Sequence, residues 1–134
     1  MFLSFDFGHK KIGIASGNTL LDSASPQPPL PCGKNGQPNW DTVATLIAEW
    51  QPDTLVVGLP LNMDGSESES SQRARKFGQR LHGRFGLPVF MVDERLSTRE
   101  ARQRTGIHHA DPKVDSVAAV IIAEGFLSDG GQRL

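Results

Sequence analysis

Apolar and polar residues alternate along the chain with two different periods, and these periods predict where its strands and helices lie. Strands are predicted at residues 2–7, 11–16, 54–57 and 88–92, because each is a short, mainly apolar run bounded by turn-forming residues. A further strand is predicted at 22–30, where several prolines indicate an edge strand or an early end. Apolar residues spaced three and four apart predict helices. These are a helix capped by Asn39 or Asp41 that ends before Pro52, and helices at 71–85, 97–106 and 111–127.

This order of elements predicts an α/β fold. Three strands in succession indicate an antiparallel part of the sheet, whereas strands that alternate with helices indicate a parallel part covered by helices. We therefore expect one mixed sheet with helices on both faces, and the first strand, which is the most apolar, at its centre. The length of 134 residues and the lack of internal repeats fit a single domain over residues 1–134.

Composition excludes several classes of protein. Hydrophobic residues make up 37% of the chain and charged residues 22%, which is ordinary for a globular protein. No apolar run is long enough to span a membrane, and the start of the chain lacks the features of a signal peptide. Cys32 is the only cysteine, so no intrachain disulfide can form and a reducing compartment is expected. We expect a cytoplasmic protein that does not bind membranes.

Charge is distributed unevenly, although the net charge is only −1. Residues 73–104 include nine basic and three acidic residues, whereas residues 1–72 include three basic and eight acidic ones. The helix predicted in the basic segment presents Arg73, Lys76 and Arg80 on one face. Such a face is compatible with binding to a polyanion, and a solvated helix surface is the alternative.

Three acidic residues occupy positions where the local pattern predicts burial. Asp6 interrupts the apolar run of the first strand, and Glu94 closely follows the strand at 88–92. Asp115 lies on a helical stripe with apolar residues three, four and seven positions later. A carboxylate among apolar residues is costly unless it is paired or binds a cation. Together the three residues predict a shared metal site.

The predicted chemistry follows from bringing three carboxylates together. At about 5 Å and an effective dielectric near 20, each pair of like charges costs roughly 3 kcal/mol, so their convergence needs a counter-ion. Oxygen ligands without a His or Cys cluster select Mg²⁺ or Mn²⁺. One or two such ions are suited to the hydrolysis of phosphodiester bonds, which is the reaction class that we expect.

Each carboxylate also has an interpretation without a metal. Asp6 can simply open a turn. Glu94 can form a surface ion pair with Arg95, worth under about 1 kcal/mol. Asp115 can stabilise its helix by interaction with the N-terminal dipole. Only the combination of the three predicts a metal site.

Basic residues near the carboxylates are candidates for contacts with the phosphates of a nucleic acid. They are Lys10, Lys11, Arg95 and Arg99, together with Arg73, Lys76 and Arg80 of the basic helix.

Four segments of the chain resemble the YqgF/RuvX family. They read DFGHKKIGIA at 6–15, VGLPLNMDG at 57–65, DERLST at 93–98 and VDSVAA at 114–119, and they cover nearly the whole chain. The resemblance implies an RNase H-like fold with a mixed five-stranded sheet, in which strands 1–3 are antiparallel and strands 1, 4 and 5 are parallel.

The resemblance also implies roles for individual residues. Asp6, Glu94 and Asp115 match the acidic residues that form the catalytic and metal-binding triad of the family. Asn62 of the second motif is assigned to nucleic-acid binding. Lys11 stands where many relatives carry arginine, so contacts there would be those of a point charge rather than a bidentate guanidinium.

The function implied is that of a metal-dependent endonuclease of the bacterial cytoplasm that acts on structured nucleic acid. Family members are described as nucleases that process the 5′ end of precursor 16S rRNA, and also as Holliday junction resolvases that act on branched DNA. We expect the first substrate and keep the second as the alternative.

Two other classes of function stay open at this point. The segment that begins at Asp6 also resembles the first phosphate loop of actin-like and sugar-kinase folds, but those proteins bind ATP between two such domains. A non-catalytic nucleic-acid-binding protein with the same fold is the other possibility. Mixed charge and an edge strand permit either a monomer or a homodimer.

Overall fold

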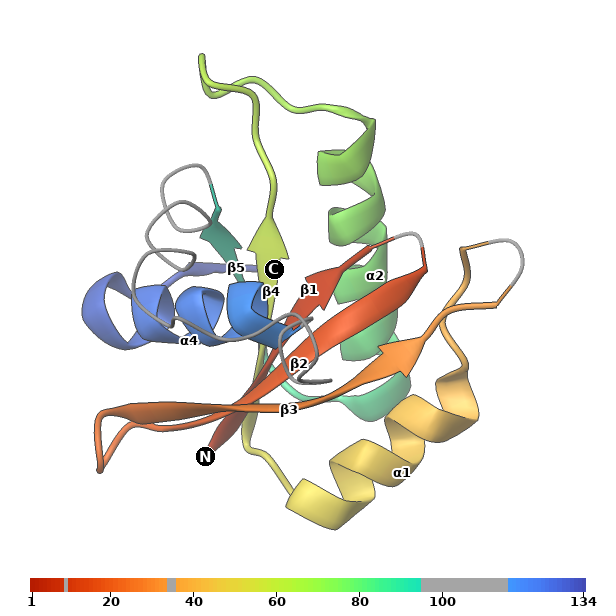
Figure 1. The fold of residues 1–134 in the computed structure, drawn as a ribbon, viewed down its shortest axis with the longest axis vertical. Coiled ribbons are helices and arrows are strands. Elements are labelled where there is room, and N and C mark those ends of the chain that lie inside the picture. Colours follow the sequence, from red (N-terminus) through yellow and green to blue (C-terminus); the bar gives the residue numbers. More distant parts are fainter. Residues whose placement is uncertain (9, 34–35, 95–115) are drawn as a thin grey trace.

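A mixed β-sheet organises the chain in the computed structural model, which describes residues 1–8, 10–33, 36–94 and 116–134. Its six strands have the order β3-β2-β1-β4-β5-β6 (Figure 1). They are β1 (Phe2–Phe7), β2 (Lys11–Asn18), β3 (Ser23–Pro31), β4 (Thr54–Leu59), β5 (Val89–Asp93) and β6 (Gln132–Arg133). The described helices are α1 (Trp40–Trp50), α2 (Glu69–Phe85) and α4 (Val117–Asp129).

The pairing of the strands confirms the predicted mixed sheet with β1 in its interior. Strand β1 pairs antiparallel with β2 and parallel with β4, and β4 pairs parallel with β5. The carboxyl ends of β1, β4 and β5 therefore lie at the same edge of the sheet, where open α/β sheets bind their ligands.

The predicted number of five strands was wrong, because a sixth strand forms at the end of the chain. Strand β6 pairs antiparallel with β5, with Arg133 opposite Phe90. The chain reverses after α4 at Gly130, whose φ of 72° is accessible mainly to glycine. Both residues of β6 are polar and exposed, so they carry no hydrophobic period from which a strand could be predicted.

The proline-rich strand β3 lies at the edge of the sheet, as predicted, but it does not end early. It pairs with β2 from Asn18 opposite Ser23 to Lys11 opposite Pro31. Because β3 has a neighbour on one side only, prolines that cannot donate a hydrogen bond are tolerated on its free side.

Two helix boundaries show the value and the limit of capping signals. Asn39 caps α1, since its side chain accepts hydrogen bonds from the backbone N–H groups of Asp41 and Thr42. Helix α2 begins at Glu69 with Ser68 as its cap, two residues before the predicted start at Ser71. The helix predicted at 97–106 and the start of the one predicted at 111–127 lie outside the described residues.

Helices cover both faces of the sheet, as predicted, and each face has its own apolar core. Helices α1 and α2 pack against one face, on a core that includes Leu3 and Phe5 of β1. Helix α4 packs against the other face, on a core that includes Phe2 (Figure 1). Because successive residues of a strand point to opposite faces, Asp6 belongs to the face covered by α4 and Phe7 to the face covered by α2.

Two buried serine hydroxyls attach the first half of α4 to the sheet. The hydroxyl of Ser116 donates to the carbonyl oxygen of Gln27 at 2.6 Å and accepts from the backbone N–H of Ile14 at 3.0 Å. It fits where the β2–β3 pairing is irregular next to Ile14. The hydroxyl of Ser4 on β1 donates to the carbonyl oxygen of Ala119 at 2.5 Å. These bonds fix the position at which α4 crosses the sheet.

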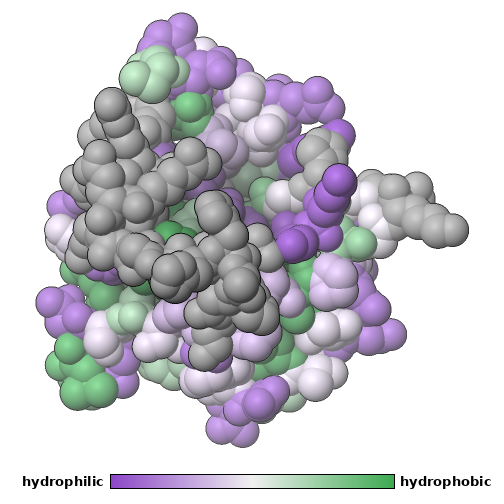
Figure 2. All heavy atoms as spheres, in the orientation of Figure 1, coloured by the Kyte–Doolittle hydropathy of each residue, from purple (hydrophilic) through white to green (hydrophobic). Residues whose placement is uncertain are grey.

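The surface in view is mainly hydrophilic around its rim, with an apolar group of side chains at the lower left (Figure 2). That group lies over the turn between β2 and β3, where Leu20 and Leu21 are exposed. Within the parts of the chain that the structure describes, no helix has the length and apolar character needed to cross a membrane.

Replacement of Ser116 by alanine is expected to lower the free energy of unfolding by about 1–3 kcal/mol, because it leaves the Ile14 N–H and the Gln27 carbonyl without their partner. Urea unfolding followed by circular dichroism measures the change. Ser128→Ala is the matched control, since Ser128 is exposed on the same helix and should change stability by under about 0.5 kcal/mol. Equal effects of the two substitutions would contradict the anchoring role of Ser116.

Candidate metal and nucleic-acid site

Asp6 and Glu94 meet at the carboxyl ends of the parallel strands. Asp6 is the penultimate residue of β1, opposite Gly13 of β2. Glu94 directly follows β5, and its backbone N–H donates to the carbonyl oxygen of Leu59, the last residue of β4, at 3.1 Å. This backbone bond extends the pairing of β4 and β5 by one step and holds Glu94 at the end of the sheet. Both carboxyl groups are partly buried and are hydrogen-bonded to each other.

Gly58 of β4 makes room for the Glu94 side chain. It lies between β1 and β5 in the sheet, opposite Val92. A Cβ atom at this position would lie only 2.6 Å from Cδ of Glu94 and would also overlap the side chain of Ile122 on α4. The strand that separates β1 from β5 thus has no side chain where the two carboxyl groups approach each other.

The environment of the pair favours one shared proton. Burial raises the pKa of Asp6, whereas the hydrogen bond from Glu94 lowers it. Burial, the negative charge of Asp6, their hydrogen bond and the nearby charge of Asp93 together raise the pKa of Glu94 to about 8. With its pKa raised in this way, a protonated Glu94 donates the hydrogen bond that joins it to the Asp6 carboxyl group.

A divalent cation is the natural replacement for that proton. Loss of the proton would leave two negative charges in a partly apolar site, which only a positive charge can compensate. Carboxylate oxygens are the ligands that Mg²⁺ and Mn²⁺ prefer, so the donor atoms of the pair fit either ion. Among the described residues, however, no three His, Cys, Asp or Glu side chains group closely enough to hold a metal ion.

The third predicted ligand cannot be placed, since Asp115 lies outside the described residues. The same holds for two of the predicted contacts with nucleic acid, Arg95 and Arg99. The described residue next to Asp115 in the sequence is Ser116, which is anchored on β2 and β3 as shown above. The roles of Asp6, Glu94 and Asp115 in binding metal stay predictions.

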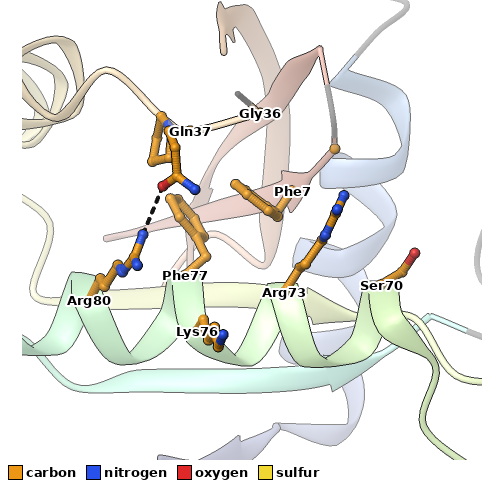
Figure 3. A pocket seen from close by; sticks show the side chains of 10 residues that line it. Phe7, Gly36, Gln37, Ser70, Arg73, Lys76, Phe77 and Arg80 are labelled. Carbon is orange, nitrogen blue, oxygen red and sulfur yellow. Dashed lines mark hydrogen bonds between the residues drawn. The ribbon is translucent and has the colours of Figure 1, made fainter. Parts of the chain in front are cut away.

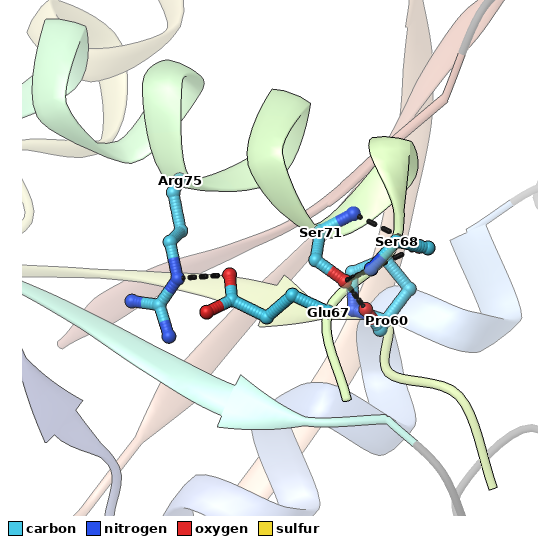
Figure 4. Close-up of polar contacts among 5 residues, drawn as sticks. All are labelled: Pro60, Glu67, Ser68, Ser71 and Arg75. Carbon is cyan, nitrogen blue, oxygen red and sulfur yellow. Dashed lines mark hydrogen bonds and ion pairs between the residues drawn. The ribbon is translucent and has the colours of Figure 1, made fainter. Parts of the chain in front are cut away.

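The loop after β4 holds Asn62 and is fastened to α2 at several points (Figure 4). The hydroxyl of Ser71 donates to the carbonyl oxygen of Pro60 and accepts from the backbone N–H of Ser68 at 2.9 Å. Arg75 forms an ion pair with Glu67 at 2.6 Å.

Asn62 itself is exposed on this loop, at the carboxyl end of β4. Its Nδ2 donates to the hydroxyl of Ser66 at 3.0 Å, and the Ser66 backbone N–H donates to Asp64 at 2.9 Å. In this arrangement the Asn62 side chain stabilises the loop. Its predicted contact with nucleic acid stays a prediction.

The predicted basic residues fall into two groups. Lys10 and Lys11 are exposed at the turn after β1 and the start of β2. Arg73, Lys76 and Arg80 follow one another along α2 and line a pocket beside Phe7, Gly8 and residues 36–38 (Figure 3). The structure thus brings the second group together around one pocket, on the face of the sheet opposite to the carboxyl pair.

Two structural residues of the site were not predicted from the sequence. Gly58 carries a local signal, because a glycine inside an apolar strand often marks a close approach of another group. Ser116 carries none, since a serine near a helix start is typical of any cap. Which atoms meet the Ser116 hydroxyl depends on how α4 crosses the sheet.

Comparison with known proteins places the chain in a class and then in a family. Thermus thermophilus RuvC, solved in complex with a Holliday junction substrate, superposes with a TM-score of 0.59 at 12% sequence identity, over 99% of both chains. At that identity the match shows the fold, and it confirms the predicted RNase H-like architecture.

Closer relatives are found by sequence. The family model described as "RuvX: Holliday junction resolvase" matches residues 1–129. A protein of Alcanivorax borkumensis named "Putative pre-16S rRNA nuclease" is 68% identical over 128 residues, which cover 96% of each chain. One of the same name from Chromohalobacter salexigens is 54% identical over 134 residues, covering 96% of this chain and 90% of the relative. The chain belongs to the RuvX family, which confirms the resemblance seen in its motifs.

The stability of the metal-free protein is expected to fall as pH rises from about 4.5 to about 8. Glu94 holds its proton up to about pH 8 in the folded protein, but an unfolded chain releases it near the ordinary pKa of 4.5. Within this window the folded state binds the extra proton, so each pH unit lowers the free energy of unfolding by up to about 1.4 kcal/mol. Urea unfolding in EDTA at several pH values measures the slope.

Glu94→Gln removes this titration and should give a flatter dependence of stability on pH. Glu49→Gln, at an exposed position on α1, is the matched control and should keep the slope of the original protein. If Glu94→Gln and Glu49→Gln gave equal slopes, the shared proton would be excluded.

Gly58→Ala is expected to lower the free energy of unfolding by about 1–3 kcal/mol, because the new methyl group overlaps the Glu94 carboxyl group and Ile122. Gly83→Ala is the matched control. It faces open space in α2 and should stabilise the protein by roughly 0.5–1 kcal/mol. Thermal and urea unfolding measure both changes, and a neutral Gly58→Ala would show that the carboxyl pair does not need this gap.

Proposed function

We propose that residues 1–134 form one domain that acts as a metal-dependent endonuclease on structured RNA, with the 5′ end of precursor 16S rRNA as its substrate. The observation that carries the proposal is the hydrogen-bonded pair of Asp6 and Glu94 at the carboxyl ends of the parallel strands. Two relatives with at least 54% identity bear the name of a pre-16S rRNA nuclease. Processing of ribosomal RNA agrees with the cytoplasmic location expected from the single cysteine.

In this proposal Asp6, Glu94 and Asp115 are the residues that hold one or two Mg²⁺ or Mn²⁺ ions. When bound, such ions activate water and stabilise the charge that develops on the phosphate oxygens. The protein contributes fixed carboxylate oxygens: the bond from the Glu94 backbone to Leu59 and the gap at Gly58 keep the Glu94 side chain near Asp6. Glu94 must release its proton before both carboxylates can bind a cation.

The basic residues would hold the nucleic acid. Lys10 and Lys11 lie at the turn that follows Asp6, so they are close to any phosphate at the carboxyl pair. Arg73, Lys76 and Arg80 supply positive charge on α2. These side chains would position the sugar–phosphate backbone without reading its sequence.

Branched DNA is the second candidate substrate. It is favoured by the description of the matching family model as a Holliday junction resolvase. Cleavage of a four-way junction would also use divalent metal ions and a basic surface, so the carboxyl pair supports both substrates equally. The two are separated by a direct comparison of cleavage.

Asp6→Asn is expected to reduce cleavage of a precursor 16S rRNA fragment, in the presence of Mg²⁺ or Mn²⁺, to below about a hundredth of the original rate. The substitution removes a proposed metal ligand. Mutation of a residue that only hydrogen-bonds to a metal ligand already costs about 10–100-fold in metal affinity or activity. Cleavage is followed on denaturing gels with 5′-labelled RNA, beside a four-way DNA junction offered at the same concentration.

Asp53→Asn is the control, because Asp53 is exposed just before β4, at the end of the strand away from the carboxyl pair. It should cleave at the original rate. Equal cleavage by Asp6→Asn would show that the activity does not belong to this site. Cleavage of the junction alone would replace the RNA proposal by the DNA alternative.

A further inference from the structure

A small basic pocket lies beyond the carboxyl end of β1, on the face of the sheet opposite to Asp6. It has a volume of about 230 Å³ and lies between Gly8, residues 36–38 and α2 (Figure 3). Three basic side chains line it, and none of the described residues that line it is acidic. The pocket therefore suits a negatively charged ligand.

The three cations share one face of α2, because Arg73, Lys76 and Arg80 are spaced three and four residues apart. Arg80 donates from Nη1 to Oε1 of Gln37 at 2.8 Å, so a neutral partner orients it and its charge is kept. Arg73 pairs with Glu69 at 3.2 Å, but 42% and 82% of the two side-chain surfaces are exposed, and such surface pairs are weak. The pocket keeps an excess of positive charge.

An aromatic ring forms another wall of the pocket. Phe7 is partly exposed, lines the pocket and stacks on Phe77, with ring centroids 4.8 Å apart and an interplanar angle of 18°. Phe77 is almost completely buried, so it fixes the orientation of the Phe7 ring. Figure 3 shows Arg73 rising from α2 beside this ring. A site for phosphate alone has no need of an aromatic wall, whereas unpaired bases are held by stacking on such rings.

The size of the pocket suits a single base rather than a base pair. Its 230 Å³ is below the roughly 300–1,000 Å³ of pockets for drug-sized molecules, so it accommodates about one base and no base pair. In a duplex the bases are stacked on one another and turned inward. Only an unpaired nucleotide can present a base and a phosphate to the pocket together.

We propose that this pocket binds one unpaired nucleotide, with its base against Phe7 and its phosphate between Arg73 and Lys76. The proposal rests on the proposed nuclease function and adds that the substrate carries a single-stranded segment beside the cleaved bond. Asp6 and Phe7 are consecutive in β1 and point to opposite faces of the sheet. A single strand with its reacting phosphate at Asp6 would therefore continue around the end of β1 into the pocket.

The test measures binding without turnover. Fluorescence anisotropy compares a short single-stranded RNA with a duplex of the same sequence, using Asp6→Asn protein in EDTA. Introducing Phe7→Leu into the Asp6→Asn protein should weaken binding of the single strand at least about fivefold, as expected for loss of one stacked base. The same substitution should change the affinity for the duplex by less than about twofold. Addition of Lys76→Gln should weaken single-strand binding and reduce its salt dependence by about 0.7 in the slope of log K against log salt.

Arg84→Gln is the matched control for the loss of charge. Arg84 lies on the same helix outside the pocket, 4.4 Å from the centroid of the Trp40 ring, and its replacement should change single-strand affinity by less than about twofold. If Phe7→Leu does not fold, judged by circular dichroism, Lys76→Gln decides. An equal loss of affinity for duplex and single strand, or no loss for either, would contradict the proposal that the pocket binds an unpaired nucleotide.

The two proposals fail in different ways. Absence of metal-dependent cleavage by the original protein would remove the nuclease proposal and leave the difference between single-strand and duplex binding intact. If the original protein cleaves RNA but Phe7→Leu and Lys76→Gln leave single-strand binding unchanged, the pocket proposal is contradicted and the nuclease proposal stands.

Discussion

The parallel pairing of β4 with both β1 and β5 is the constraint on which the site depends. It places Asp6 and Glu94, which are far apart in the sequence, one strand apart at the same edge of the sheet. A side chain at Gly58 would overlap the Glu94 carboxyl group in its present position, so the missing side chain leaves room for Glu94 across that strand. The backbone bond between Glu94 and Leu59 then fixes how far Glu94 can move from the sheet.

This geometry places two acidic groups in a contact that is unfavourable when both are ionised, and a bound cation would offset their repulsion. Burial and the charge of Asp6 raise the pKa of Glu94, because two carboxyl groups in a partly buried contact cannot both be ionised without a large cost. A protein selected only for stability would have an apolar residue at one of these positions. Retaining both acids costs stability at neutral pH, and in the proposed nuclease the compensation would be a pair of oxygen ligands that is already in place before a metal ion binds.

Much of the fold could be predicted because its signals are local. The interior position of β1 followed from its apolar run, and Asp6 could be recognised because it interrupts that run. Other features depend on tertiary contacts and leave little trace in the sequence. The sixth strand is two polar residues that pair only because the chain reverses after α4. The part of Ser116 in anchoring α4 depends on the irregular pairing of β2 and β3.

Phe7 shows why the aromatic wall of the basic pocket could not be predicted, although the three basic residues could. In the sequence it is one more apolar residue of a strand, and alternation predicts only that it enters a core. In the structure it sits at the end of β1, where the core stops, so one part of the ring packs on Phe77 and another lines the pocket. The same strand end thus presents an acid to one face and an aromatic ring to the other. One flexible strand of nucleic acid can reach both faces around this strand end. The division of chemistry between the two faces therefore favours a substrate that is unpaired next to the bond to be cut.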